Sequence, residues 1–158
     1  MILYRFDRQP LEGIVNPDGY LLQERIEMIT LDGSIQNPAY TEFKALCFVS
    51  ESGKADLFTE HKSFERRPKM PGLWTRFLFR DGDQLDGILS HNLLEWPKNG
   101  FSIIPPRAGA TRQRVFIPRA ALTATELRGV VGASGASSRS RKKEGRAQDG
   151  DQLTMFER

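Results

Sequence analysis

Apolar and polar residues alternate with a period of two along short runs of the chain, and this alternation is typical of half-buried β-strands. The runs 2–7 and 73–80 show it most clearly, and both contain aromatic residues. Asp-Gly pairs at 32–33 and 81–82 supply tight turns next to such runs. There is no helical period of useful length, although a single helical turn near Tyr40–Phe43 is left open. The pattern therefore predicts an all-β protein.

The same order of segments occurs twice along the chain, which indicates an internal repeat. Each copy contains the pattern Leu-acid-Gly followed by two aliphatic residues, with Gly13 in the first copy and Gly87 in the second. Glycine inside a strand marks a bulge or a sharp bend, so each copy predicts about five short, bent strands of a small barrel. The matched segments are 6–15 with 79–89, 26–31 with 101–106, Pro38 with Pro118, and 43–49 with 122–128.

Changes in composition divide the chain into four parts. The segment between the two copies is polar and basic, and we expect it to lie on the surface, anchored by Leu57, Phe58 and Phe64. The stretch 133–146 lacks apolar residues that could offset the entropy of ordering, so we expect the tail to be disordered. The predicted parts are a first five-stranded barrel at 1–53, the connecting segment at 54–72, a second five-stranded barrel at 73–132 and a basic tail at 133–158.

Composition narrows the class of protein further. The chain has 158 residues and a formal net charge of +3. Its single cysteine, Cys47, excludes an internal disulfide and fits a reducing compartment, so we expect a bacterial cytoplasmic protein. No apolar run is long enough to span a bilayer, and the N-terminus lacks the pattern of a signal peptide. Cys47 lies in an apolar run and is predicted to be a small core residue.

The residues offer little of the chemistry that enzymes need. Two histidines and one cysteine give no metal-ligand spacing, and there is neither a Gly-rich phosphate loop nor a nucleophile with a nearby base. Asp81, Asp83 and Asp86 cluster after a predicted strand, where acids usually form a solvated hairpin. We therefore expect no catalytic residue, no metal and no cofactor.

The second copy resembles the Sm-like (LSm) family of small β-barrels. The resemblance implies tandem Sm-like or SH3-like barrels with an RNA-binding pore, to which His91 and Asn92 would contribute from a polar loop and Arg119 from a turn. The alternative, in which Asn92 and Arg119 only satisfy turns, stays open. The segments that carry the resemblance are 76–92 and 114–122 in the second copy, and 11–16 and 34–49 in the first.

Basic residues interleave with aromatic ones in parts of the chain. Guanidinium groups can hold phosphates, and rings such as Phe64 and Trp74 can stack on unpaired bases. The alternative is an ordinary solvated face whose aromatic residues are buried. Besides the implied pore residues, the candidate nucleic-acid contacts are Arg66, Arg67, Lys69, Arg112, Arg114, Arg141, Lys142 and Lys143.

The segment Gln152-Leu153-Thr154-Met155-Phe156 resembles the bacterial sliding-clamp-binding pentapeptide Gln-Leu-(Ser/Asp)-Leu-Phe. An extended segment of this kind can present its Gln amide to a polar subsite and its three apolar side chains to apolar pockets. Met155 in place of Leu nearly conserves volume. The resemblance implies docking on the clamp, and the alternatives are an accidental apolar patch or another peptide-binding partner.

Together these patterns predict a non-enzymatic adaptor. Its tandem barrels would bind nucleic acid or protein, and Gln152–Phe156 would dock on the bacterial DNA sliding clamp. The alternative is a protein-interaction or ring-forming scaffold with no clamp or nucleic-acid role. Such a scaffold would be a homo-oligomer that associates through exposed edge strands of the barrels. Neither hypothesis includes a membrane partner.

Overall fold

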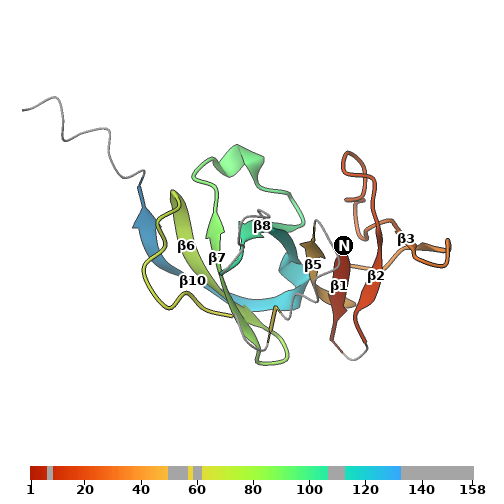
Figure 1. Ribbon diagram of the computed structural model, residues 1–158, viewed down its shortest axis with the longest axis horizontal. Coiled ribbons are helices and arrows are strands. Elements are labelled where there is room, and N and C mark those ends of the chain that lie inside the picture. Colours follow the sequence, from red (N-terminus) through yellow and green to blue (C-terminus); the bar gives the residue numbers. More distant parts are fainter. Residues whose placement is uncertain (7–8, 50–56, 59–61, 107–112, 133–158) are drawn as a thin grey trace, which may run out of the picture.

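The computed structural model describes residues 1–6, 9–49, 57–58, 62–106 and 113–132. The fold is all-β, as the sequence predicts, and the helical structure of the described residues is limited to two short 3₁₀ turns (Figure 1). Within this part of the chain, no helix has the length and apolar character needed to cross a membrane. The strands are β1 (Ile2–Arg5), β2 (Leu11–Ile14), β3 (Met28–Thr30), β4 (Ile35–Gln36), β5 (Phe43–Phe48), β6 (Gly72–Phe79), β7 (Gln84–Leu89), β8 (Gly100–Ile104), β9 (Arg114–Pro118) and β10 (Leu122–Val131). The 3₁₀ turns are η1 (Leu93–Glu95) and η2 (Arg119–Ala121).

All ten strands belong to one antiparallel sheet, in the order β10-β6-β7-β8-β9-β5-β1-β2-β3-β4. We call β1–β5 the first half and β6–β10 the second half. Across the sheet, each half begins with its fifth strand, which is followed by its first, second, third and fourth strands. The halves are joined where β5 pairs with β9, through Leu46–Phe116, Cys47–Val115 and Phe48–Arg114. The sequence predicts two separate barrels, whereas the described strands form a single open sheet in which the order of strands repeats.

The register of the strand pairs repeats together with their order. In both halves the pairing of the first and fifth strands shifts at the same place. Gly13 and Gly87 hold the same position in the second strands, because a Cβ at either would overlap the third strand, at the Ile29 carbonyl oxygen or the Ile103 side chain. Residues of the two halves can thus be equated strand by strand. The pairs flanking the shift are Tyr4–Ala45 and Arg5–Phe43 in the first half, and Leu78–Ala124 and Phe79–Leu122 in the second.

The β5–β9 pair is a wall shared by two hydrophobic cores. On one side Cys47 and Val115 belong to a core built mostly from the second half, and on the other Leu46 and Phe116 belong to a core of the first half. Burial on both faces explains why β5 reads as a nearly continuous apolar run. Cys47 is completely buried, which confirms the prediction of a core residue, and burial raises the pKa of its thiol to about 11.

The acidic residues around the β6–β7 hairpin are not simply solvated. Asp86 is only 1 % exposed, and its carboxylate accepts hydrogen bonds from Arg76 Nε at 2.7 Å and Trp74 Nε1 at 3.3 Å. The Nζ of the buried Lys44 lies 2.6 Å from a carboxylate oxygen of Asp81. A solvated hairpin is therefore the wrong interpretation of Asp86, and Asp81 helps to hold the second half against β5 of the first.

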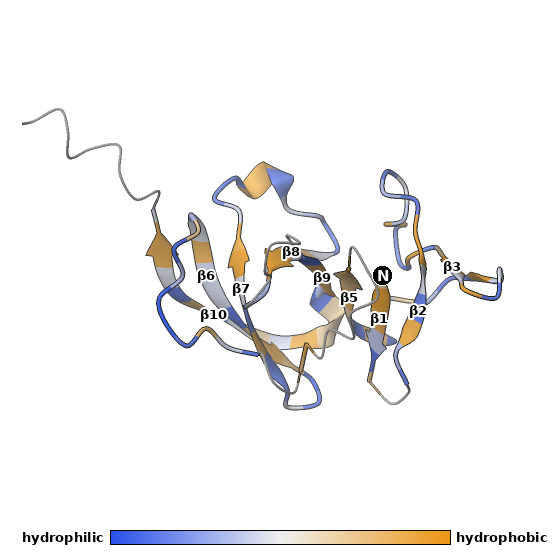
Figure 2. Ribbon diagram, viewed as in Figure 1, coloured by the Kyte–Doolittle hydropathy of each residue, from blue (hydrophilic) through white to orange (hydrophobic). Residues whose placement is uncertain are grey.

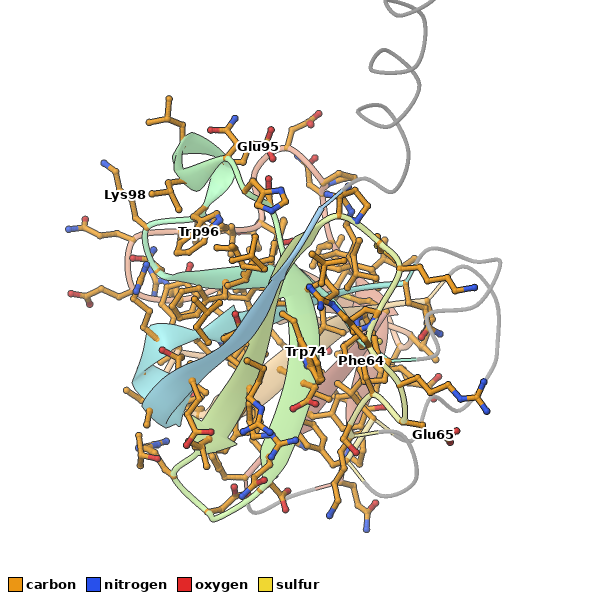
Figure 3. The ribbon with its side chains drawn as sticks, turned by 90° about the vertical axis from the view of Figure 1, so that its left-hand side faces the viewer. Phe64, Glu65, Trp74, Glu95, Trp96 and Lys98 are labelled. Atoms are coloured by element: carbon orange, nitrogen blue, oxygen red, sulfur yellow. The ribbon has the colours of Figure 1, made fainter. Side chains whose placement is uncertain are left out.

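Part of the connecting segment lies along β7. The Lys62 carbonyl oxygen accepts a hydrogen bond of 2.7 Å from the backbone N–H of Asp86, and the Phe64 N–H donates to the Asp86 carboxylate. The Phe64 ring packs edge-on against Trp74, as Figure 3 shows. Further upstream, the buried Leu57 joins the core of the second half. Lys62 and Phe64 therefore lie along β7, whereas Leu57 packs into the core of the second half.

Candidate interaction surface

Three isoleucines form a row across the last strands of the first half. Ile14 pairs directly with Ile29, which pairs in turn with Ile35. Directly paired residues project from the same face of a sheet, so the three side chains lie abreast, on the face opposite to the buried Met28. They are 66 %, 47 % and 63 % exposed, respectively. We call Ile14, Ile29 and Ile35 the isoleucine ladder, and Figure 2 shows hydrophobic positions on β2 and β3 at this end of the sheet.

The second half carries isoleucines at two of the three corresponding positions, and Arg114 takes the place of Ile35. Ile88 pairs with Ile104 as Ile14 pairs with Ile29. Ile88 is only 3 % exposed, and the backbone of Gly72 lies against its side chain. Met70 and Pro71 line a cavity of about 280 Å³ together with Ile88 and Ile104. The ladder is thus the uncovered counterpart of a position that the fold covers elsewhere.

The hairpin between β3 and β4 is held by a compact set of hydrogen bonds. The Asp32 carboxylate accepts from the Thr30 hydroxyl at 2.5 Å and from the Ser34 backbone N–H at 3.0 Å. These bonds, first from Thr30 and then from Ser34, lower the pKa of Asp32 to about 2. The hairpin that carries two of the three ladder residues is therefore well defined in shape without help from a partner.

The two edge strands, β4 and β10, carry polar residues at the positions where the paired strands β5 and β9 carry apolar ones. Among the described strands, β4 pairs only with β3 and β10 only with β6. If a second copy joined these edges in the manner of β5 and β9, Glu126 would enter an apolar core, and burying an unpaired charge is unfavourable. This disfavours the association through edge strands that the scaffold hypothesis requires. For the joint residues Leu46, Cys47, Val115 and Phe116, the corresponding edge residues are Thr125, Glu126, Gln36 and Asn37.

The residues implied to line an RNA-binding pore make the contacts of ordinary turns. Asn92 caps η1, where its Oδ1 accepts from the Leu94 N–H at 3.2 Å and its Nδ2 donates to Glu95 at 3.1 Å. Arg119 donates from Nε to the Lys98 carbonyl oxygen at 3.2 Å, and its guanidinium lies over the Phe101 ring. These contacts match the alternative in which both residues satisfy turns. His91 is exposed next to Asn92.

The other predicted nucleic-acid contacts come from separate elements. Arg66, Arg67 and Lys69 are exposed on the connecting segment, where Arg67 donates to the Val130 carbonyl oxygen at 2.9 Å. Arg114 is exposed at the start of β9. In the part of the chain that the structure describes, no three His, Cys, Asp or Glu residues are placed to hold a metal ion. The candidates outside the described residues are Arg112, Arg141, Lys142, Lys143, and the peptide Gln152, Leu153, Thr154, Met155 and Phe156.

A cleft of about 570 Å³ lies between β1, β2 and the turn after β4. Two of its lining residues are arginines, and both guanidinium groups donate to backbone carbonyl oxygens. Arg5 reaches Gln9 at 3.1 Å, and Arg80 reaches Thr41 at 2.7 Å while it lies over the Phe6 ring. The arginines therefore fasten the loops that border the cleft.

The ladder escaped prediction because its residues read as ordinary strand residues. In β3 the apolar Met28 and Ile29 are adjacent, so one of them must face away from the core of the first half. The alternation does not show whether a further segment covers the outer face. Adjacent apolar residues in a short strand were the available signal.

The described strands form one sheet that repeats its strand order, and an exposed apolar row lies at one end of it. The chain belongs to a family described only as a family of unknown function, DUF6982, whose model matches residues 1–129. No curated protein and no solved structure matches the chain. The family match extends over the sheet into β10 and stops short of Gln152–Phe156.

Proposed function

We propose that this protein is a non-enzymatic adaptor with two binding elements. The folded part binds an extended protein segment through the isoleucine ladder, and Gln152–Phe156 docks on the bacterial sliding clamp. The ladder is the observation that carries the proposal for the folded part. Its side chains project outward from a well-held hairpin, in a row whose counterpart at Ile88 is covered by a chain segment.

Burial of the ladder by a partner would provide part of the binding energy. Fully burying an isoleucine side chain contributes roughly 1.5–3 kcal/mol, and each ladder residue gains about half of this because it is already about half buried. Association and ordering costs consume part of the gain, so the apolar side chains of the partner segment must supply the rest of the affinity.

The proposal includes a finer description of the fold. Each half, at 1–53 and 73–132, is a five-stranded barrel of Sm-like or SH3-like type, and the two barrels share the β5–β9 pair as a common wall. Two observations support this. Each half has its own hydrophobic core, and the order and register of strands repeat between the halves.

Docking on the clamp rests on the sequence of Gln152–Phe156, which lies outside the described residues. A peptide of this length binds weakly by itself, and tethering it to a folded part that engages a second partner raises its effective concentration. An adaptor built this way brings the partner of the ladder to the clamp. Nucleic acid is the competing ligand for the folded part.

The ladder is tested with full-length protein in which Ile14, Ile29 and Ile35 are all replaced by serine. Proteins captured from a bacterial lysate by the wild type are purified and titrated against both forms. We expect at least one to bind the wild type saturably and to lose at least tenfold in affinity for the triple variant. A matched control replaces Leu93 and Leu94, two exposed leucines of η1, by serine and should bind like the wild type.

Equal affinity of every purified candidate for the wild type and the triple variant would overturn the ladder as a binding site. A gel shift of single-stranded RNA or DNA that weakens with salt would then support nucleic acid as the ligand of the folded part.

The tail is tested by titrating a synthetic peptide of residues 151–158 against purified bacterial sliding clamp. Saturation in the micromolar range is expected, because a few apolar anchors carry most of the affinity of a short peptide. The Phe156→Ala peptide should not bind, whereas Arg158→Ala, outside the pentapeptide, should bind like the parent. An absence of binding by the parent peptide would remove the clamp from the proposal.

A further inference from the structure

The covered row of the second half shows what kind of segment fits the ladder. The segment beside Ile88 contains Met70 and Pro71 and belongs to the same chain. None of the described residues covers the ladder in the same way, since all three isoleucines are about half exposed or more. An occupant of the ladder therefore needs apolar side chains of about the size of Met.

The chain itself contains such a segment outside the described residues. Leu153, Met155 and Phe156 are apolar, and they follow a basic stretch. The two regions have opposite charge, because residues 1–49 contain seven Asp and Glu against four Lys and Arg, whereas residues 133–158 contain six Lys and Arg against four acids. Glu12, which precedes Ile14 by two residues and so shares its face, adds an exposed carboxylate beside the ladder.

The length of the chain permits the contact. Nineteen residues lie between Gly132, the last described residue, and Gln152. A chain of that length spans up to about 70 Å when fully extended. Gly132 follows β10 at one end of the sheet and the ladder lies at the opposite end, so the intervening chain must be largely extended to reach the ladder.

From the uncovered ladder, the covered counterpart and the opposite charges, we infer that the isoleucine ladder binds the chain's own segment Gln152–Phe156 within the same molecule. This inference rests on the proposed function, because it names an occupant of the same ladder. The ladder and the clamp then compete for one peptide. A partner that occupies the ladder releases the peptide for the clamp, so the adaptor exposes its clamp-binding element only when it is loaded.

Disulfide cross-linking in the full-length protein tests this contact. The test variant carries Ile29→Cys and Met155→Cys, and the control carries Leu94→Cys and Met155→Cys. Leu94 is an apolar residue that is 94 % exposed, so its thiol is at least as accessible as one at Ile29. The native Cys47 is completely buried, and its raised pKa keeps the thiol protonated and unreactive.

Under mild oxidation with dilute protein, the Ile29 variant should give an intramolecular disulfide in at least fivefold excess over the Leu94 control, and mass spectrometry should identify the linked peptides. Equal yields from the two variants would overturn the inference. A product that migrates as a dimer would place the tail of a second copy on the ladder and would overturn the intramolecular contact.

The inference and the proposed function can fail separately. If no specific disulfide forms while the isolated peptide still binds the clamp, the proposed adaptor function is retained and the intramolecular contact between the tail and the ladder is rejected. If the disulfide forms and the peptide does not bind the clamp, the contact stands and the clamp is not the partner.

Discussion

The two halves of the sheet present isoleucines at the same register, and only one half covers them. Ile88 lies against the backbone of Gly72, whereas Ile14 is 66 % exposed at the corresponding position. The acidic residue two positions earlier differs in the same way, since Asp86 is buried in hydrogen bonds and Glu12 is exposed. The same strand pattern therefore serves for stability in the second half and is left free for binding in the first.

The largest expected effect separates the two acidic positions. Asp86→Ala leaves Arg76, the Trp74 indole and a backbone N–H without their acceptor, so the free energy of unfolding should fall by about 3 kcal/mol or more. Glu12→Ala should change it by less than about 0.5 kcal/mol. Urea denaturation of both variants measures the difference, and similar losses would contradict the contrast between the halves.

Substitutions of Ile88 and Ile14 should differ nearly as much in their effect on the free energy of unfolding. Ile88→Ala removes a buried side chain and should lower the free energy of unfolding by about 2–4 kcal/mol, whereas Ile14→Ala should cost less than about 0.5 kcal/mol. Denaturant titration, monitored by tryptophan fluorescence, compares the two. Both substitutions are made in the Phe156→Ala background, so that the chain's own tail does not cover the ladder, and a costly Ile14→Ala in that background would contradict the exposed ladder.

The corresponding glycines should respond unequally as well. An alanine Cβ at Gly13 would overlap the backbone of β3 at Ile29, whereas at Gly87 it would overlap the side chain of Ile103, which can shift. Both substitutions should destabilise by about 1–3 kcal/mol, with Gly13→Ala the more costly. Thermal unfolding of the two variants gives the order, and a harmless Gly13→Ala would contradict the close contact of β2 with β3.

The smallest effect concerns the ion pair between the halves. Burial by itself would raise the pKa of Asp81, but the hydrogen bond from Lys44 and that from the Asp83 backbone N–H outweigh it, and the pKa is lowered. A lowered pKa stabilises the fold above the unfolded value near 4, and this contribution disappears as the pH falls through the folded pKa. Lys44→Met should therefore weaken the loss of stability below pH 4, as measured by denaturation between pH 2 and 6. If the wild type and Lys44→Met lose stability equally below pH 4, the ion pair between Lys44 and Asp81 does not contribute to stability.

The repeat could be predicted because both halves contain strand glycines and alternating apolar residues, and each of these patterns indicates one kind of local structure. Gly13 and Gly87 are required by close strand contact, and the alternation of 2–7 and 73–80 indicates strands with one buried face. The shared wall was beyond prediction, since the apolar run Phe43–Phe48 shows that a strand is buried on both faces and does not name the second neighbour.

The site was harder to predict than the fold. The cluster of acids predicts a solvated Asp86, although Arg76 lies directly opposite it across the Asp-Gly hairpin and counting back from the turn pairs the two residues. The ladder depends on which apolar face remains uncovered, and coverage arises from segments distant in sequence, such as Gly72 against Ile88. Periodicity carries no information about such contacts.

The central claim is that the isoleucine ladder is an open docking surface for an extended peptide. It is tested most directly by methyl NMR of the full-length Phe156→Ala protein, labelled at isoleucine δ1 methyl groups, during titration with the synthetic peptide of residues 151–158. We predict saturable shifts of Ile14, Ile29 and Ile35, while Ile88 and Ile104 under their own covering segment stay unchanged. Shifts confined to other methyl groups, or none up to millimolar peptide, would contradict the account.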